Sequence, residues 1–332
     1  MGVQVRAVAI EAAGAVRGWA GAHPKLVTGA GTLATVGGLA FVLAGRWGQF
    51  ANAMVAASPW FLGAAVALHV ASLVARSEAW HLSVRAAGAT VARRRVYRAA
   101  SIGFVGNIIN GELGFALRIA TLRRSSPQQV PRVATLAATE VPLIVVEGTL
   151  ATLTSFTLVE PLGLQWWAPL AGFAVMLAVT LALRSLVRRR SAGWRAGLAV
   201  LGDGPVCARM TGFVALAVCG QVARNWLMLQ ASGIHASVFD ATALLIAVAV
   251  LGALPVGPSV GAAAAVLILG AEGVAGVSAA GVLLTATGTV GALAYAAWAS
   301  IDRRRRRPVP SASRERPAPA VVSAPSVKAG VR

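Results

Sequence analysis

The chain has 332 residues, of which 57% are hydrophobic and 12% charged, and its mean hydropathy is +0.72. No soluble domain of this length needs so much apolar sequence, so the composition excludes a soluble globular protein and predicts a polytopic membrane protein. The net charge of +19 comes from arginine clusters beside apolar runs. This placement argues against nucleic-acid binding, because there is no soluble basic domain to hold a duplex or a strand.

Residues 1–25 predict a cytoplasmic N-terminal segment. The apolar run 26–44 is longer than the core of a signal peptide, so we expect it to be a retained first span. The further apolar segments are 57–75, 99–122, 133–158, 166–187, 210–230, 241–256, 257–271 and 277–300. Together these segments predict an all-α transmembrane domain over residues 26–300. Residues 301–332, rich in Pro, Ser, Ala and Arg, predict a disordered basic cytoplasmic tail.

The basic residues predict the orientation of the chain in the membrane. Nearly all Lys and Arg residues fall in alternate connections, namely 1–25, 84–98, 118–132, 184–209 and 301–332. The connections between these hold Arg46 alone. Because positively charged loops stay in the cytoplasm, we expect a multi-pass protein of the inner (cytoplasmic) membrane with both termini in the cytoplasm. About eight crossing helices satisfy the loop charges.

Two apolar segments are interrupted by polar, helix-breaking sequence, at residues 107–114 in the first half and at residues 255–261 in the second. Freed backbone groups find no water in hydrocarbon, so such breaks occur where the backbone packs in protein or lines a wet cavity. The second break predicts a broken helix pair near 241–271. Paired interruptions in corresponding halves indicate a transport-type site.

The first break predicts a re-entrant helical hairpin near 99–122. Both connections that flank the hairpin are basic and belong in the cytoplasm, so the segment must enter and leave on one side, turning at Asn110 and Gly111. The half-helix that starts there would present free N–H groups and a positive dipole end, which suit a phosphate. Arg118, nearly two helical turns beyond Glu112, would strengthen such a site.

Ionisable residues at membrane depth are candidates for function, because a lone buried charge is costly. Glu140 and Glu147 lie seven residues apart, hence on one helical face. They are either a proton- or cation-sensing pair at a cavity, or carboxyl groups that are protonated or are paired with arginine for structural reasons. Arg224, in mid-span, needs a carboxylate or a phosphate. We expect it to pair with Glu140 or Glu147, with a lipid phosphate competing for it. Arg76 and Glu78, at a helix end, predict an interfacial charge pair.

The sequence carries no signature of a catalytic or metal site. It contains no HExxH, P-loop or Cys/His cluster, and Cys207 and Cys219 show no ligand spacing. The hydrophilic connection at about 188–209 is too short for a catalytic domain. We therefore expect no catalytic residue, no metal, no cofactor and no enzymatic activity of this chain alone.

Several short motifs follow one another along the chain. Residues 76–82 read Arg-Ser-Glu-Ala-Trp-His-Leu, and residues 107–118 contain Asn, then Gly-Glu-Leu-Gly, then Arg. Glu140 follows in the next span. Residues 255–261 read Pro-Val-Gly-Pro-Ser-Val-Gly, and residues 270–273 read Gly-Ala-Glu-Gly. In this order, the motifs resemble the transmembrane region of lysylphosphatidylglycerol synthases and their stand-alone flippase-like relatives.

The chain departs from the family's motifs at several positions. In the hairpin, Asn110 replaces a proline, Glu112 an arginine and Phe115 an acidic residue. Ala264 stands where the family commonly has a glutamate after the second break. The resemblance implies the fold and the binding or translocation of a phosphate-bearing lipid, but not the family's own substrate. We expect no aminoacylation of lipid, because this sequence does not include the soluble aminoacyl-transfer domain.

Our leading hypothesis is a flippase-like protein that binds and translocates a phospholipid or a polyprenyl-phosphate-linked lipid. The expected substrate-binding residues are Asn107, Gly111, Gly114, Arg118, Glu140 and Arg224. The expected gating residues are Glu147, Pro255, Pro258 and Gly261. Two alternatives stay open: a non-transporting subunit that docks a lipid- or envelope-modifying enzyme, and a membrane-embedded transferase that acts on a lipid-linked donor. The expected partners are an anionic lipid and the membrane, with an enzyme partner or a second copy of the chain as alternatives.

Overall fold

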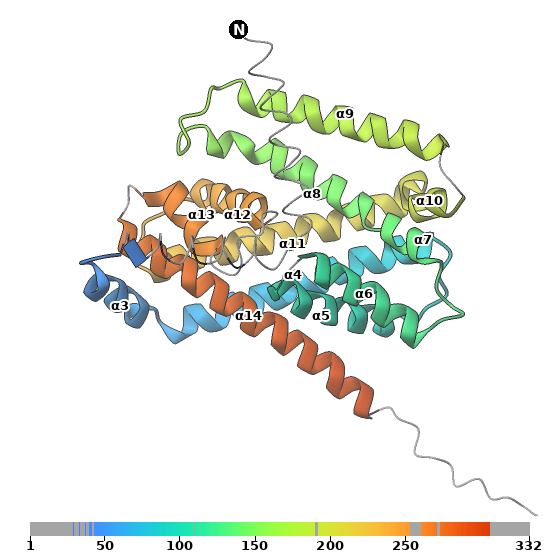
Figure 1. Cartoon of the computed structure of the whole chain (residues 1–332), viewed down its shortest axis with the longest axis horizontal. Helices are drawn as coiled ribbons and strands as arrows, with labels where there is room; N and C mark the ends of the chain where they lie inside the picture. Colours follow the sequence, from blue (N-terminus) through green and yellow to red (C-terminus); the bar gives the residue numbers. More distant parts are fainter. Residues whose placement is uncertain are drawn as a thin grey trace, which may run out of the picture.

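A computed structural model describes residues 43–109, 111–189, 192–252, 260–270 and 273–305, together with Gly29, Leu33, Gly37, Ala40 and Phe41. Every regular element within these ranges is a helix (Figure 1). The expected all-α architecture of a polytopic membrane protein is confirmed. The elements are α3 (Trp47–Ala56), α4 (Pro59–Ala86), α5 (Arg93–Ile109), α6 (Gly111–Ser125), α7 (Val133–Ala138), α8 (Val141–Thr154), η1 (Ser155–Leu158), α9 (Ala168–Arg189), α10 (Ala192–Gly197), η2 (Ala199–Gly202), α11 (Gly204–Ala231), α12 (Val238–Gly252), α13 (Val260–Leu269) and α14 (Val274–Arg305).

Four helical stretches are long and apolar enough to cross a membrane. They are Pro59–Ala86, Val133–Leu158, Gly204–Ala231 and Val274–Ile301. Each coincides with a span expected from the length of its apolar run, since about 20 apolar residues cross the hydrocarbon core. Ala168–Ala182 and Val238–Leu251 are shorter apolar helices. The total of about eight crossings stays a prediction, because most of the expected span 26–44 lies outside the described residues.

Helices α4, α11 and α14 pack against one another at the centre of the molecule, and glycines allow them to approach closely. A Cβ on Gly220 of α11 would overlap Ser72 Oγ of α4. A Cβ on Gly291 of α14 would lie 2.7 Å from His69 Cδ2 of α4. Small residues at helix contacts are typical of membrane proteins, in which close van der Waals packing holds helices together.

Helices α5 and α6 form the helical hairpin that the sequence predicts. Near its turn, a Cβ on Gly106 of α5 would lie 2.8 Å from Gly114 Cα of α6. At its base, Arg95 Nη1 donates a hydrogen bond of 2.8 Å to Ser126 Oγ. Because α5 and α6 are in contact both near the turn and at the base, the two helices run antiparallel. Asn110, at the expected turn, lies outside the described residues, and entry of the hairpin into the membrane stays a prediction.

Helices α12 and α13 are the short helices expected on either side of the second break, and Figure 1 shows them side by side. Residues 253–259, which join them, lie outside the described residues. Helices α3 and α10 fall in segments that were expected to be connections. Six-residue α10 packs on α7 through Gly197, where a Cβ would overlap Ala138 Cβ. Its helical form therefore depends on tertiary contact, because a helix this short is not stable alone.

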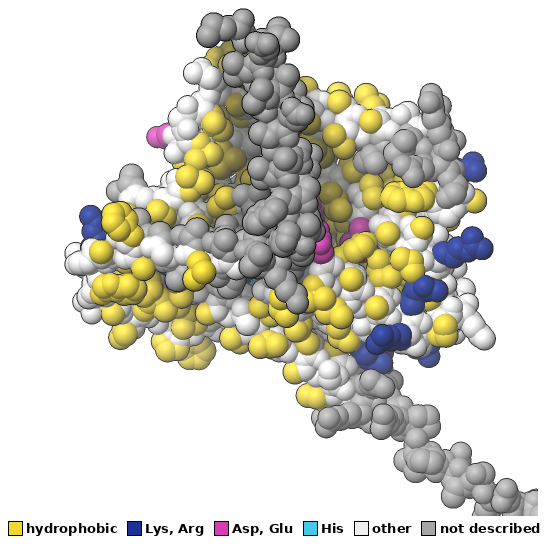
Figure 2. Space-filling view, viewed as in Figure 1, with side chains coloured by type: hydrophobic (Ala, Val, Ile, Leu, Met, Phe, Trp, Pro, Cys, Tyr) yellow, Lys and Arg dark blue, Asp and Glu magenta, His cyan; other side chains and the backbone are white. Residues whose placement is uncertain are grey.

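Arginine side chains gather at one end of the bundle, which we call the basic end. Figure 2 shows dark-blue side chains along the right side of the molecule. The helix ends and connections there carry Arg85, Arg93, Arg94, Arg95, Arg98, Arg123, Arg124, Arg132, Arg195 and Arg209. The described helix ends and connections at the other end carry Arg46, Glu160 and Asp240. The charge asymmetry expected from the sequence is thus present in the folded chain.

Tyr295 of α14 is buried and joins α4 through a short hydrogen-bond chain. Its hydroxyl donates to Ser77 Oγ at 3.0 Å, and Ser77 Oγ donates to the Leu73 carbonyl at 2.8 Å. Tyr295→Phe should lower the free energy of unfolding by about 1 kcal/mol, the net value of one buried hydrogen bond. SDS titration in mixed micelles measures this change. If the double variant Tyr295→Phe with Ser77→Ala loses as much free energy of unfolding as the two single variants together, the bond contributes nothing.

Candidate functional site

Two arginine–carboxylate pairs join α4 and α6 to the span that contains α7 and α8. Arg118 Nη2 of α6 lies 2.6 Å from Glu140 Oε2. Arg76 Nη2 of α4 lies 2.9 Å from Glu147 Oε2. Glu140 immediately precedes α8 and is two helical turns from Glu147, so both pairs lie on one side of the span. We call these four residues the paired-charge site.

The break between α7 and α8 places Glu140 beside Arg118. Pro142 has no N–H and cannot continue the hydrogen-bond ladder, so the helix is interrupted at Thr139 and Glu140. Trp80 packs at this break, and its Nε1 donates to Thr139 Oγ1 at 3.2 Å. The guanidinium of Arg118 stacks over the Trp80 ring, with Cζ 4.6 Å from the ring centroid. Contact with the face of the Trp80 ring therefore helps to fix the position of the Arg118 guanidinium.

The two pairs differ in exposure. The side chains of Arg118 and Glu140 are 11% and 7% exposed, whereas those of Arg76 and Glu147 are 39% and 26% exposed. Figure 2 shows acidic side chains recessed near the middle of the bundle. A partly exposed charge inside a span is tolerated at a water-filled hollow and costly against hydrocarbon. The paired-charge site thus consists of a closed pair and an open pair.

The expected pairing of Arg224 with Glu140 or Glu147 is wrong, because both carboxylates pair with other arginines. Arg224 is buried and donates to Gln221 Oε1 at 2.9 Å and to the Leu284 carbonyl. No ion pair within the described ranges involves it. The neutral oxygens of Gln221 and Leu284 thus accept the hydrogen bonds that a carboxylate was expected to accept. Matching opposite charges in the sequence cannot predict such acceptors.

Small and polar neighbours make room for Arg224. A Cβ on Gly288 would lie 3.0 Å from Arg224 Nη2. His69 Nδ1 lies 2.9 Å from Gln221 Nε2 and 3.3 Å from Arg224 Nη1. These contacts join α4, α11 and α14. They give Arg224 a structural role at the centre of the bundle, and its binding of phosphate stays a prediction.

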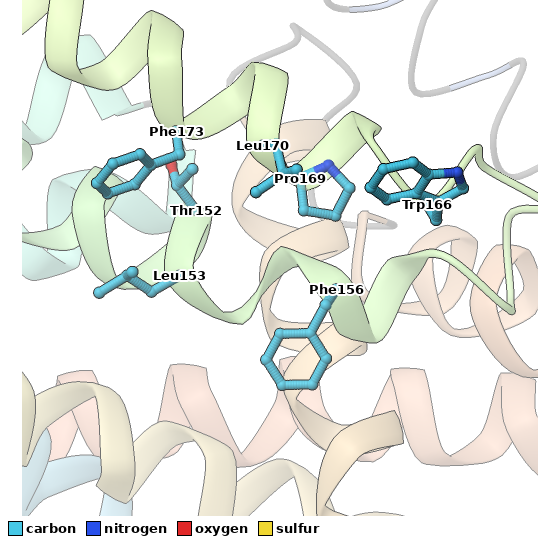
Figure 3. A pocket seen from close by; sticks show the side chains of 7 residues that line it. All are labelled: Thr152, Leu153, Phe156, Trp166, Pro169, Leu170 and Phe173. Carbon is cyan, nitrogen blue, oxygen red and sulfur yellow. The ribbon is translucent and has the colours of Figure 1, made fainter.

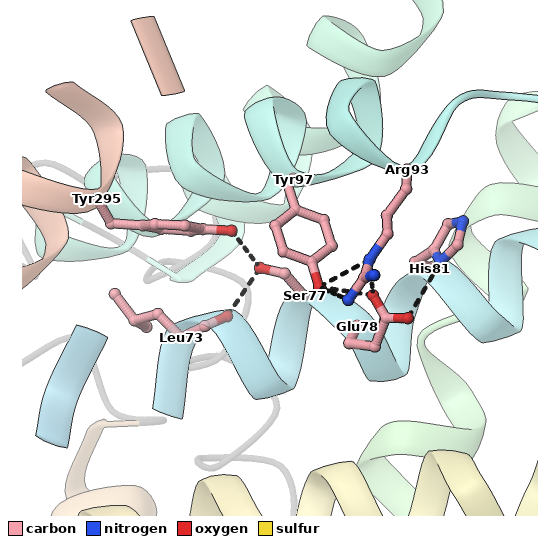
Figure 4. A network of polar contacts seen from close by, with 7 residues as sticks. All are labelled: Leu73, Ser77, Glu78, His81, Arg93, Tyr97 and Tyr295. Atoms are coloured by element: carbon pink, nitrogen blue, oxygen red, sulfur yellow. Dashed lines mark hydrogen bonds and ion pairs between the residues drawn. The ribbon is translucent and has the colours of Figure 1, made fainter. Parts of the chain in front are cut away.

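The expected pair between Arg76 and Glu78 is also wrong, because Glu78 points toward α5 (Figure 4). Tyr97 Oη donates to Glu78 Oε2 at 2.6 Å, and Arg93 Nε donates to the same oxygen at 2.7 Å. His81 Nδ1 lies 3.6 Å from Glu78 Oε1. Burial and the hydrogen bond with Glu78 raise the pKa of Tyr97 to about 12, so its hydroxyl remains protonated and donates.

The hairpin residues expected to bind phosphate have two different environments. Gly114 is buried: a Cβ there would lie 2.5 Å from the Gly103 carbonyl oxygen and would overlap Asn107 Oδ1. Gly111, the first residue of α6, is exposed and has open space around it. Gly114 and Asn107 therefore hold the hairpin together, and phosphate binding at this turn stays a prediction.

The paired-charge site, the hairpin of α5 and α6, and the helix pair α12 and α13 all lie within one stretch of the chain that matches a family model. The family model for the lysylphosphatidylglycerol synthase transmembrane region matches residues 28–299. The chain belongs to this family. No curated protein and no solved structure matches it significantly.

This member of the lysylphosphatidylglycerol synthase transmembrane-region family departs from the common pattern at Ala264, which is fully buried among apolar side chains of α12, α13 and α14. A glutamate there would need a buried partner, so the alanine fits its surroundings. Of the expected gating residues, Gly261 lies in the first turn of α13. Pro255 and Pro258 lie outside the described residues.

An apolar groove of about 460 Å³ lies between α8 and α9 (Figure 3). It is lined by Thr152, Leu153, Phe156, Trp166, Pro169, Leu170 and Phe173. The Thr152 hydroxyl donates to the Gly148 carbonyl within α8, so it is already satisfied. The groove offers no charged group and is not a candidate for binding a headgroup.

The sequence places Trp80 in the motif at residues 76–82 but does not predict its contact with Arg118. Trp80 does lie four residues after Arg76 and therefore on the same face of α4. Thr139, which supports the paired-charge site, and Arg93 and Tyr97, which hold Glu78, are not predicted, because sequence alone gives no indication of their partners.

Proposed function

We propose that the chain binds and translocates a phosphate-bearing lipid, either a phospholipid or a polyprenyl-phosphate-linked lipid. The observation that carries the proposal is the Arg76–Glu147 pair, which is partly exposed although it lies within spans. A phosphate offers a guanidinium the same bidentate acceptor geometry as a carboxylate. A headgroup can therefore replace Glu147 on Arg76.

The closed pair, Arg118 and Glu140, keeps its position during this exchange. Arg118 is held by Glu140 and by the face of Trp80, so it stays in place while the open pair exchanges partners. Glu147, once released from Arg76, acts as the gate, because the lipid leaves when the carboxylate returns. The family membership supports a lipid as the ligand, since the family is named for a region of a lipid-modifying protein. The proposal gives the chain no catalytic step and no cofactor.

The basic end supports an orientation in the cytoplasmic membrane with both termini in the cytoplasm. Its arginines face the side on which positively charged connections are retained, and they also attract anionic lipid by about 1 kcal/mol per charge near the surface. The paired-charge site then lies beyond this surface, inside the bilayer. An anionic headgroup would reach it from the cytoplasmic leaflet.

The proposal predicts that Arg76→Gln slows lipid movement at least about tenfold, because losing one charge-assisted contact costs about 1.5–3 kcal/mol. The measurement uses purified protein in liposomes that contain fluorescent phosphatidylglycerol, with dithionite quenching the label on the outer leaflet. Glu147→Gln should retain more lipid than the wild type in native mass spectrometry, because Arg76 no longer has a competing carboxylate.

Arg209→Gln is the matched control, because Arg209 is an exposed arginine of the basic end that lies outside the paired-charge site. Its rate should stay within about twofold of the wild type, as surface charges contribute little. Equal rates for wild-type liposomes and empty liposomes would refute translocation. The docking-subunit alternative would then explain the chain better, and a requirement for a lipid-linked donor would favour the transferase.

A further inference from the structure

An open recess of about 580 Å³ lies at the basic end, where α4 ends and α5 begins. It is lined by Glu78, His81 and Arg85 of α4, by residues 89–92 of the connection and by Arg93 of α5. None of these residues belongs to the paired-charge site. Glu78, His81 and Arg85 are spaced three and four residues apart, so they share one face of α4, whereas Arg76 and Trp80 share another.

Two side chains of the recess, Arg85 and Arg93, have donors that are available to an anion. Arg85 is exposed, and no ion pair within the described ranges involves it. Arg93 bonds Glu78 and Tyr97 through Nε and Nη2, which leaves its Nη1 amine for another acceptor. His81 is only 6% exposed, and its Nδ1 lies 3.6 Å from Glu78 Oε1, so it lines the recess without offering it a donor.

The start of α5 adds a second source of positive potential. The first N–H groups of a helix have no intrahelical acceptor, and the helix dipole is positive at this end. Helix N-termini with these properties bind phosphate and sulfate readily. Glu78 is the carboxylate in the lining, which also contains the guanidinium groups of Arg85 and Arg93, so the recess as a whole is positive.

We propose that this recess binds a phosphate group at the membrane surface, held by Arg85, Arg93 Nη1 and the N-terminus of α5. The phosphate belongs to an anionic lipid headgroup or is free inorganic phosphate. The lipid source rests on the proposed function, whereas the phosphate chemistry does not. Arg85 lies nine residues after Arg76 on α4, about 14 Å along the helix axis. The recess therefore holds a headgroup before it reaches the paired-charge site.

The test is native mass spectrometry of the full chain in mild detergent, titrated with phosphatidylglycerol. Diacylglycerol, which has the same tails and no phosphate, is the comparison lipid. Arg85→Gln should weaken phosphatidylglycerol binding about tenfold, the equivalent of one charge-assisted hydrogen bond to the phosphate. Glu78→Gln should strengthen it by a similar factor, because the amide still accepts from Arg93 and Tyr97 while the negative charge is removed. Loss of the fold would not produce changes of opposite sign. Arg209→Gln should match the wild type.

The same titration in an Arg76→Gln background separates the recess from the paired-charge site. In this background, Arg85→Gln must still weaken the binding of phosphatidylglycerol. If the wild type moves no lipid but Arg85→Gln weakens binding, translocation alone is refuted and the recess stands. Inorganic phosphate that displaces phosphatidylglycerol from the wild type, and no longer binds Arg85→Gln, would assign the recess to the free anion. Equal binding of phosphatidylglycerol by Arg85→Gln and Arg209→Gln, or equal binding of diacylglycerol and phosphatidylglycerol by the wild type, would overturn the proposal.

Discussion

Glu140→Gln should lower the free energy of unfolding by about 3–5 kcal/mol, because it leaves the buried Arg118 guanidinium without its opposite charge. The two side chains are 7% and 11% exposed, so solvent cannot take the place of the lost carboxylate. The Trp80 ring beneath Arg118 contributes a weaker attraction, of about 0.5–2 kcal/mol, and cannot compensate. SDS titration in mixed micelles measures the change.

The double variant Arg118→Gln with Glu140→Gln separates charge pairing from packing. It should be more stable than Glu140→Gln alone, because no unpaired charge remains buried. Glu147→Gln is the matched control, since the Arg76–Glu147 pair is open and should lose no more than about 1 kcal/mol if the hollow contains water. A loss for Glu147→Gln as large as that for Glu140→Gln would mean that both pairs are closed.

Gly114→Ala should lower the free energy of unfolding by about 3 kcal/mol, at the upper end of the cost of overpacking. The added Cβ would lie 2.5 Å from the Gly103 carbonyl oxygen, a backbone atom that cannot rotate away. It would also displace the Asn107 side chain from its place between α5 and α6. The hairpin would have to open, and the contact of Arg118 with Glu140 would shift with it.

Gly111→Ala makes the same chemical change three residues earlier, where a Cβ meets no atom within 4 Å. Its stability should equal or slightly exceed that of the wild type, because alanine favours helix over glycine by about 1 kcal/mol. Both variants are measured by the same SDS titration. Similar losses for Gly111→Ala and Gly114→Ala would contradict close packing at Gly114. Lipid loss in Gly111→Ala at full stability would support phosphate binding at the turn.

The long spans were predictable because a membrane imposes a length on every helix that crosses it. The apolar runs at 57–75, 133–158, 210–230 and 277–300 therefore coincide with described helices. The hairpin was predictable from two basic connections on either side of a broken segment. Helix α10 was not, because it has no periodic apolar face and depends on contact with α7.

The candidate site was predictable in its residues but not in its pairings. Glu140, Glu147 and Arg118 are conspicuous because charges are rare in apolar runs. The sequence does not say which helices are neighbours, so Arg224 was matched to the wrong partners. The Leu284 carbonyl, which receives a hydrogen bond from Arg224, has no distinguishing side chain and cannot be found by charge matching.

The paired-charge site contains two arginines and two glutamates, so its formal charges cancel. A phosphodiester headgroup that occupies it adds one negative charge to the loaded state. Moving one elementary charge across the membrane potential is worth about 2.3 kcal/mol per 100 mV. In the proposed orientation, with the cytoplasm negative, the potential would drive the loaded state outward and would not affect the return of the empty state. The matching of the four charges thus makes the proposed transport electrogenic and gives it a preferred direction.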